Sequence, residues 1–225
     1  TTAELLWGYS DGGRFTSELP AHLMSHMARL SVDPENRIVM HCHPTNTLAM
    51  NYIHELDEKK ITHTLWQMCT ECIVVFPDGV NVLPWMLCGT NNIGEATAEK
   101  MKEFRLVIWG MHGICGAGKT MDETFGLIET VEKAAQIYML TAHMPRINTI
   151  KDSEMQELAK RFLGKDVIAS TISSGTVDGI LKEIADNAAV IEKDGKETVV
   201  NLDFVIRLRE YPVGKNGKRK AIVME

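Results

Sequence analysis

A His-x-His pair at the end of an apolar run is the feature that most constrains what this chain can fold into. The run at residues 38–40 is Ile-Val-Met and follows a turn-like segment at residues 33–36, so it predicts a β-strand. His41 and His43 extend past the end of that strand with a spacing of two. Because side chains alternate between the faces of a strand, both imidazoles are expected to point the same way and can chelate one metal ion. Two strand-end histidines with ordinary hydrogen bonds are the competing interpretation, so a metal site needs a third ligand.

The length and charge of the chain favour a globular protein that does not bind nucleic acid. Its 225 residues can bury a large core, as one domain or as one domain with a small appendage. The formal net charge of −6 gives no reason to expect nucleic acid or an anionic membrane as a partner. No apolar run approaches the roughly 20 residues that span a bilayer, and no secretory signal opens the sequence. We therefore expect neither a nucleic-acid partner nor a membrane partner.

The cysteines favour a reducing compartment. The sequence has 5 of them, an odd number without a dense framework, which is typical of free thiols in a cytoplasmic protein. Cys69 and Cys72 form a C-x-x-C pair. A zinc ribbon needs a second pair of this kind, and the sequence has none, so we interpret these two residues as packing cysteines. The expected location is the cytoplasm.

Hydrophobic periodicity predicts alternating helices and strands through residues 1–172, and therefore an α/β or α+β fold. In a first helix near residues 16–30, a stripe at helical spacing is expected to be buried, formed by Leu19, Leu23, Met27 and Leu30. The strand at residues 71–76 is expected to be central. The other helices are expected at residues 47–56, 61–68, 93–103, 120–138 and 153–164, and the other strands at residues 5–9, 80–86 and 106–109.

Residues 173–225 differ in character and are predicted to form a separate C-terminal α/β region. A short amphipathic helix is indicated by the spacing of Val177, Ile180, Leu181 and Ile184. Asp194-Gly195 lies between two β-favouring runs, which is a strong hairpin signal. Asn216-Gly217 indicates a second hairpin. We place the domain boundary between residues 172 and 173.

Residues 113–120, Gly-Ile-Cys-Gly-Ala-Gly-Lys-Thr, match the phosphate-loop pattern G-x-x-x-x-G-K-[ST] in full. In such a loop the backbone amides hold phosphates, the lysine reaches the terminal phosphates and the threonine binds magnesium. Two details count against a nucleotide site. Thr120 begins a capping box with Glu123, which places it at the N-cap rather than in the first helical turn. The chain also lacks a convincing partner strand that ends in a magnesium-binding aspartate. A glycine-rich turn is the alternative.

His112 is a candidate third metal ligand. It follows the predicted strand at residues 106–109, as His43 follows its own strand, so adjacent strand ends can bring three imidazoles together. Three histidines leave zinc an open position for substrate, which is typical of catalytic sites. Glu18 is a candidate fourth ligand or base near the ion, and Glu71 is a candidate second acid–base group. The spacing permits this site without establishing it.

Several motifs occur in an order that resembles the zinc-dependent class II aldolases, in particular those that cleave rhamnulose 1-phosphate. They are residues 16–22 (TSELPAH), the His41-Cys42-His43 segment, residues 70–72 (TEC), residues 76–80 (FPDGV) with 83–85 (LPW), His112-Gly113 and residues 122–128 (DETFGLI). The resemblance runs from about residue 5 to about residue 170. It implies a central, mainly antiparallel sheet flanked by helices, and it makes the phosphate-loop pattern a chance match.

The resemblance also implies roles for individual residues. His41, His43 and His112 match the family's zinc ligands. Glu18 matches a glutamate that ligates the resting metal and then acts as the acid–base catalyst, and Glu71 matches a second active-site glutamate that is reached across a subunit boundary. The implied cofactor is one Zn2+ per subunit. The implied assembly is a homotetramer with the active site near a subunit interface.

The implied reaction is the reversible cleavage of L-rhamnulose 1-phosphate, a small sugar phosphate, to dihydroxyacetone phosphate and L-lactaldehyde through a metal-stabilised enediolate. A related sugar-phosphate aldolase or 4-epimerase of the same superfamily is the enzyme alternative. An interaction module like the adducin head is the non-enzyme alternative, and a phosphate-loop NTPase belongs to another class. We expect no counterpart of the family's N-terminal phosphate-holding segment, and residues 173–225 do not align with the family.

Overall fold

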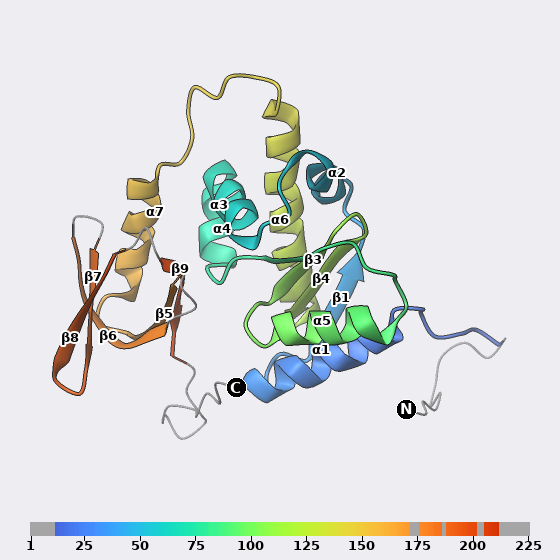
Figure 1. Cartoon of the computed structure of the whole chain (residues 1–225), viewed down its shortest axis with the longest axis horizontal. Helices are drawn as coiled ribbons and strands as arrows, with labels where there is room; N and C mark the ends of the chain where they lie inside the picture. Colours follow the sequence, from blue (N-terminus) through green and yellow to red (C-terminus); the bar gives the residue numbers. More distant parts are fainter. Residues whose placement is uncertain (1–11, 172–175, 186–187, 202–204, 212–225) are drawn as a thin grey trace.

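A four-stranded sheet forms the centre of the region that carries the histidines (Figure 1). The computed structural model of the chain describes residues 12–171, 176–185, 188–201 and 205–211. The strands of this sheet lie in the order β1 (Ile38–Cys42), β4 (Gly113–Gly118), β3 (Leu106–Trp109) and β2 (Asn81–Leu83). Neighbouring strands are antiparallel except for β2 and β3, which are parallel. The prediction of a mainly antiparallel sheet is confirmed.

Helices cover both faces of this sheet (Figure 1). One face is covered by α1 (Leu19–Val32) and α5 (Asn91–Met101), and the other by α2 (Thr45–Ile53), α3 (Glu58–Met68), α4 (Thr70–Val75) and α6 (Met121–Thr141). The alternation of side chains along β3 explains the two cores. Leu106 and Ile108 belong to the core with α6, whereas Val107 and Trp109 belong to the core with α1 and α5. The predicted helices flanking the sheet are therefore confirmed.

The segment predicted as a central strand at residues 71–76 is instead the short helix α4, so that prediction is wrong. Cys72 and Phe76 are fully buried and lie one helical turn apart, with Ile73 beside them. Two buried residues at positions i and i+4 lie on the same face of a helix, so the helix buries both. This packing outweighs the strand propensity of the β-branched residues. The strand β2 consequently pairs with β3, and not with residues 71–76.

The buried face of α1 also differs from the prediction. Leu23 is 42% exposed and Met27 is 74% exposed, whereas Ala21 and Ala28 are buried. The reason is the close approach of α5, because a Cβ atom built on Gly94 would lie 3.3 Å from the backbone nitrogen of Ala21. A crossing this tight needs small residues at the contact. The larger side chains, Leu30 among them, therefore point away from the sheet.

A second, fully antiparallel sheet follows α7 (Asp152–Ala159) and a 3-10 turn at Lys160–Phe162. Its order is β8 (Lys196–Asn201), β7 (Ala188–Lys193), β6 (Thr176–Ala185), β5 (Asp166–Thr171) and β9 (Val205–Glu210). It has its own apolar core. The predicted hairpin at Asp194-Gly195 is confirmed, and both residues have positive φ, 52° and 74°, as a two-residue hairpin turn requires.

The prediction of an amphipathic helix at residues 177–184 is wrong, because this segment lies in the strand β6. A register shift between Leu181 and Glu183 interrupts the alternation of β6 against β7. Val177, Leu181 and Ile184 nevertheless all contribute to the core of the second sheet. The bulge therefore produces the spacing of four and three that resembles a helix. The predicted strand at residues 5–9 and the predicted hairpin at Asn216-Gly217 lie outside the described residues, and the boundary at residues 172 and 173 stays a prediction.

Candidate metal centre

The pairing of β1 with β4 brings the three histidines to one end of the sheet. His41 lies in β1 opposite Cys115, and His43 follows directly after the strand. His112 lies in the turn between β3 and β4, just before the point at which β4 begins beside the end of β1. Met111 in this turn has a φ of 54°, an uncommon conformation for a residue with a side chain. Backbone strain of this kind persists where the surrounding structure fixes a turn.

The ring nitrogens of these histidines converge. The Nε2 atoms of His41 and His43 lie 3.0 Å apart. One ligand atom from each of the three residues lies within 4.8 Å of the others, and this is the one group of its kind among the described residues. The Nδ1 atom of His112 is buried and has no hydrogen-bond partner. An orphaned buried nitrogen and a set of converging imidazoles fit a divalent metal ion such as zinc.

The surroundings of His41 prepare its ring for metal binding. Its Nδ1 atom lies 3.0 Å from the carbonyl oxygen of Ile114, so the proton on Nδ1 is donated there and Nε2 keeps its lone pair. Burial, helped by the neighbouring histidines, lowers the pKa of His41 to about 4, although the hydrogen bond to Ile114 raises it in part. Burial likewise lowers the pKa of His112. A lowered pKa favours the neutral ring, which is the form that binds metal.

Two neighbours of the histidines, Trp109 and Gly113, shape this site. The ring of Trp109 packs against that of His41, with the centroids 4.3 Å apart. A Cβ atom built on Gly113 would lie 2.4 Å from the carbonyl oxygen of Cys42 and 2.8 Å from Cδ2 of His43. Only glycine fits at residue 113 without displacing the histidines. The His-Gly sequence was a signal for this close approach.

Glu18 lies near the histidines but outside the group of three. It is the N-cap residue of α1 and is 6% exposed. One carboxylate oxygen accepts a hydrogen bond of 3.2 Å from the backbone nitrogen of Gly89. Burial lowers the pKa of His112, and the charge of Glu18 opposes this effect in part, so the carboxylate lies within electrostatic range of that ring. Glu18 is therefore a buried carboxylate near the three imidazoles, and its predicted role as ligand or base stays a prediction.

Glu71 is not brought to the three histidines within the described part of this single chain. It lies in the first turn of α4, rather than at the head of the predicted strand. Its carboxylate accepts a hydrogen bond from the Cys69 thiol at 2.6 Å, which lowers the pKa of Glu71. Burial raises the pKa of Cys69, so the thiol keeps its proton and acts as the donor. The partner cysteine Cys72 is fully buried, as expected for a packing residue.

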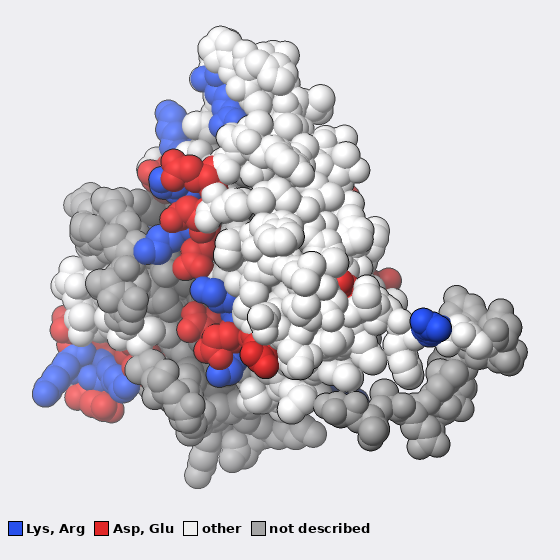
Figure 2. Space-filling view, turned by 45° about the vertical axis from the view of Figure 1, so that its right-hand side comes forward, with Lys and Arg blue, Asp and Glu red and all other residues white. Residues whose placement is uncertain are grey.

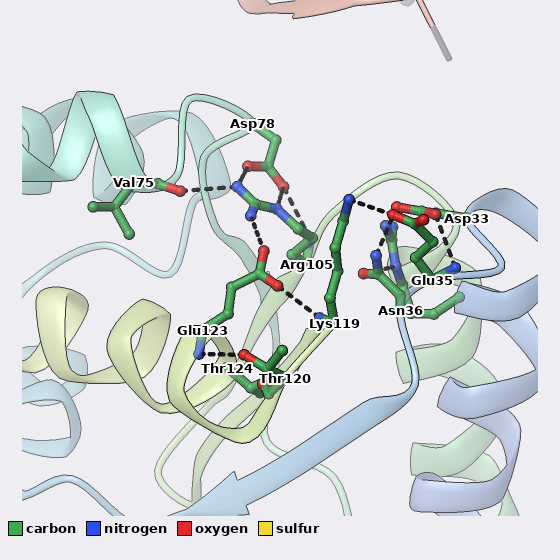
Figure 3. Close-up of polar contacts among 11 residues, drawn as sticks. Asp33, Glu35, Asn36, Val75, Asp78, Arg105, Lys119, Thr120, Glu123 and Thr124 are labelled. Atoms are coloured by element: carbon green, nitrogen blue, oxygen red, sulfur yellow. Dashed lines mark hydrogen bonds and ion pairs between the residues drawn. The ribbon is translucent and has the colours of Figure 1, made fainter. Parts of the chain in front are cut away.

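The phosphate-loop alternative is wrong. Residues Gly113–Gly118 form the buried strand β4, whose backbone pairs with β1 and β3 and cannot wrap around a phosphate. The Nζ atom of Lys119 lies 2.6 Å from Glu35 (Figure 3). The Thr120 hydroxyl accepts a hydrogen bond of 3.1 Å from the backbone nitrogen of Glu123. Thr120 is thus the predicted N-cap of α6, although the Glu123 carboxylate accepts its hydrogen bond of 2.7 Å from the backbone nitrogen of Lys119 and not from that of Thr120.

No helix in the described part of the chain is long and apolar enough to cross a membrane. This finding agrees with the absence of a long apolar run in the sequence.

Comparisons with known proteins converge on one family. The model of the Class II Aldolase and Adducin N-terminal domain matches residues 2–139. A rhamnulose-1-phosphate aldolase from Listeria monocytogenes serotype 4a (strain HCC23) is 65% identical over 159 residues, which cover 70% of this chain and 58% of that protein. A rhamnulose-1-phosphate aldolase from Enterococcus faecalis (strain ATCC 700802 / V583) is 62% identical over 160 residues, 71% of this chain and 57% of that protein.

A solved structure of a related protein has a similar fold over part of the chain. The sugar-phosphate aldolase from Thermotoga maritima matches with a TM-score of 0.55 and 31% identity, over 61% of this chain and 58% of that one. The chain thus spans somewhat more than half the length of the curated relatives it matches, 58% for the Listeria monocytogenes protein.

Proposed function

Because this chain belongs to the class II aldolase and adducin N-terminal domain family, we propose that it is a zinc-dependent aldolase, a lyase acting on L-rhamnulose 1-phosphate. The reaction is the reversible cleavage of this sugar phosphate to dihydroxyacetone phosphate and L-lactaldehyde. The observation that carries the proposal is the convergence of His41, His43 and His112. The names and identities of the relatives support the choice of substrate.

Zinc is the metal we propose for this centre. All three candidate ligands are imidazole nitrogens, which suit zinc, and three protein ligands leave a position for substrate oxygens. When bound, the ion supplies the positive charge that stabilises the enediolate left by carbon–carbon cleavage. His41 presents Nε2 because Ile114 holds the proton on Nδ1. His43 and His112 complete the set from the end of β1 and from the turn between β3 and β4.

We assign two roles to Glu18. It transfers the proton at the substrate carbon next to the carbonyl, and it is a ligand of the resting metal. Its burial and its electrostatic effect on His112 support the assignment. The hydrogen bond from Gly89 anchors one oxygen and leaves the other for a second contact.

Glu71 is assigned to the active site of a neighbouring subunit in a homotetramer. Its position on α4, away from the histidines of its own chain, is compatible with a role across a subunit boundary. Figure 2 shows a broad face with few charged side chains over the elements on the right of Figure 1. Exposed apolar side chains, each at least 62% exposed, include Met27, Tyr52, Trp85 and Leu87. Exposed apolar side chains of this kind are compatible with burial in an interface between subunits.

The proposed compartment is the cytoplasm, where free thiols stay reduced. All five cysteines lie in the described residues, and none is in a disulfide. A soluble sugar phosphate is the corresponding small-molecule partner, and neither nucleic acid nor a membrane enters the proposal.

The test is a cleavage assay on L-rhamnulose 1-phosphate before and after chelation. Release of dihydroxyacetone phosphate is followed by its NADH-dependent reduction. We expect activity that is lost with the chelator and restored by Zn2+. Cleavage that persists without metal would contradict the zinc assignment. Epimerisation of a ketose phosphate at C4, without release of an aldehyde product, would instead favour the related epimerases. Metal binding without turnover on either substrate would refute the aldolase assignment.

A further inference from the structure

Glu132 on α6 makes four hydrogen bonds to the first turn of α2, the helix that begins two residues after His43. Its Oε1 atom accepts from the backbone nitrogen of Asn46 at 2.9 Å and from the Asn46 side-chain amide at 2.8 Å. Its Oε2 atom accepts from the backbone nitrogen and the hydroxyl of Thr47, both at 2.8 Å. We propose that Glu132 is a positioning residue for the metal centre, a role that rests on the proposed function.

The need for Glu132 follows from the sequence at the start of α2. The N-cap residue is Pro44, whose side chain has no acceptor, and no side-chain cap is formed locally. The first amides of a helix have no partner within the helix, and a negative charge there also offsets the helix dipole. The Glu132 carboxylate, 85 to 86 residues further along the chain, supplies both the hydrogen-bond acceptors and the negative charge. The packing of α2 against α6 makes this contact possible (Figure 1).

The four contacts require an acceptor at every position. All the groups that face Glu132 are donors: two backbone N–H groups, an amide NH2 and a hydroxyl. An ionised carboxylate is acceptor-only and can satisfy all of them. Glutamine has the same size but turns an NH2 group toward one pair of donors. The Thr47 hydroxyl or the Asn46 amide oxygen can accept from that NH2 group, but a backbone N–H cannot, so Glu132→Gln loses at least one contact to the helix amides and adds a donor–donor conflict there without creating a cavity.

The contacts of Glu132 affect the orientation of His43 more than that of His41. The ring of His41 is oriented by the carbonyl oxygen of Ile114. His43 is exposed, and within the described residues the hydrogen bond recorded for its ring is the one to His41. The direction of His43 therefore depends on its backbone, which β1 holds on one side and the Glu132-capped turn of α2 holds on the other. Groups that hydrogen-bond directly to a metal ligand typically change metal affinity 10- to 100-fold when removed, and Glu132 acts on His43 through the two helix residues it binds, so we expect an effect near the lower end of this range.

The experiment measures the Zn2+ affinity of the chelator-stripped chain by competition with a chromophoric chelator. We expect Glu132→Gln to weaken Zn2+ binding by about tenfold. The Co2+-loaded variant should also show altered ligand-field absorption, because the geometry of the nitrogen donors changes. The matched control is Glu129→Gln, one turn earlier on α6, where the exposed carboxylate pairs with Lys133. That variant should keep the wild-type affinity and spectrum.

A role confined to the stability of α2 would lower the melting temperature of Glu132→Gln and leave its Zn2+ affinity and Co2+ spectrum unchanged, which would overturn the inference. If Glu132→Gln does not fold, Thr47→Val decides, because it removes one contact and keeps the shape of the side chain. We expect a smaller, measurable loss of affinity in Thr47→Val, and wild-type affinity there would refute the positioning role. A wild-type chain that binds no Zn2+ would instead refute the proposed function itself.

Discussion

The Nε2 atoms of His41 and His43 lie 3.0 Å apart, with Nδ1 of His41 turned to the carbonyl oxygen of Ile114. The lone pair on Nε2 of His41 therefore points at its neighbour. Two lone pairs at this separation repel unless a proton or a cation lies between them. His112 offers a third ring nitrogen within 4.8 Å of the other two, so a metal ion can be bound by all three imidazoles.

Gly113→Ala should weaken metal binding although it removes no ligand. The new methyl group would clash with the carbonyl oxygen of Cys42 and with the ring of His43, at 2.4 and 2.8 Å. We expect Zn2+ affinity to fall by at least about tenfold, as for other changes that misorient ligands. Competition with a chromophoric chelator measures it.

The control for that prediction is Gly126→Ala in α6, where a Cβ atom would meet nothing within 4 Å. This substitution should leave Zn2+ affinity unchanged and stabilise the helix by up to about 1 kcal/mol. Wild-type Zn2+ affinity in Gly113→Ala would show that the close approach at residue 113 does not shape the site.

Glu18→Ala should keep the metal and lose turnover. Three imidazoles remain to hold the ion, whereas loss of a positioned acid–base group typically costs about 100-fold or more in kcat. The measurements are metal content and the cleavage rate at saturating substrate. Glu95→Ala, on the exposed side of α5, is the control and should retain full activity. Near-normal turnover in Glu18→Ala would remove this residue from the chemistry.

Lys119→Ala should leave metal binding and cleavage unchanged. Its partner is Glu35, and both side chains are substantially exposed, at 49% and 67%. Exposed ion pairs contribute little, so we expect the free energy of unfolding to change by less than about 1 kcal/mol. Denaturant unfolding and the cleavage assay test this. A variant that folds but loses cleavage would mean that the motif at residues 113–120 has a catalytic part.

Asp78→Asn should destabilise the fold in a pH-dependent way. Asp78 is buried and accepts hydrogen bonds from the Arg105 guanidinium at 2.7 and 3.2 Å, and the same guanidinium donates to the carbonyl oxygen of Val75 at the end of α4 (Figure 3). Breaking such a buried pair costs about 3 kcal/mol. Burial alone would raise the pKa of Asp78, but the charge and hydrogen bonds of Arg105 outweigh it and lower the pKa.

The sign of the pH effect follows from that lowered pKa. The stabilisation from ionised Asp78 is complete above the unfolded-state pKa of about 3.9 and is lost as the pH falls through the folded-state value. Urea unfolding at a series of pH values should therefore give a difference between wild type and Asp78→Asn that is largest near pH 7 and shrinks below about pH 4. A difference that stays constant down to pH 3 would mean that the charge of Asp78 is not what stabilises the pair.

Local signals in the sequence predicted much of the fold and the site. The spacing of His41 and His43 determines that both rings share one face of a strand, and the capping box at Thr120 and the hairpin at Asp194 need only neighbouring residues. The third ligand was accessible because His112 follows a recognisable buried strand. Each of these features depends on few residues and on backbone geometry common to all proteins.

What the sequence could not supply was tertiary context. Residues 71–76 have β-branched side chains, yet they form a helix because Cys72 and Phe76 share a buried face. The bulge in β6 gives a strand the spacing of a helix. The contact of Glu132 with Asn46 joins positions 86 residues apart, and no local pattern predicts it. These features follow from packing between elements, which single-sequence periodicity does not contain.

The most direct test of the metal centre is a Zn2+ titration of the chelator-stripped chain, with bound metal measured at each step. The account predicts saturation at one Zn2+ per chain, and loss of that binding when His41, His43 and His112 are all replaced by alanine. Saturation at one Zn2+ in the triple variant, or no binding by the folded wild-type chain, would contradict it.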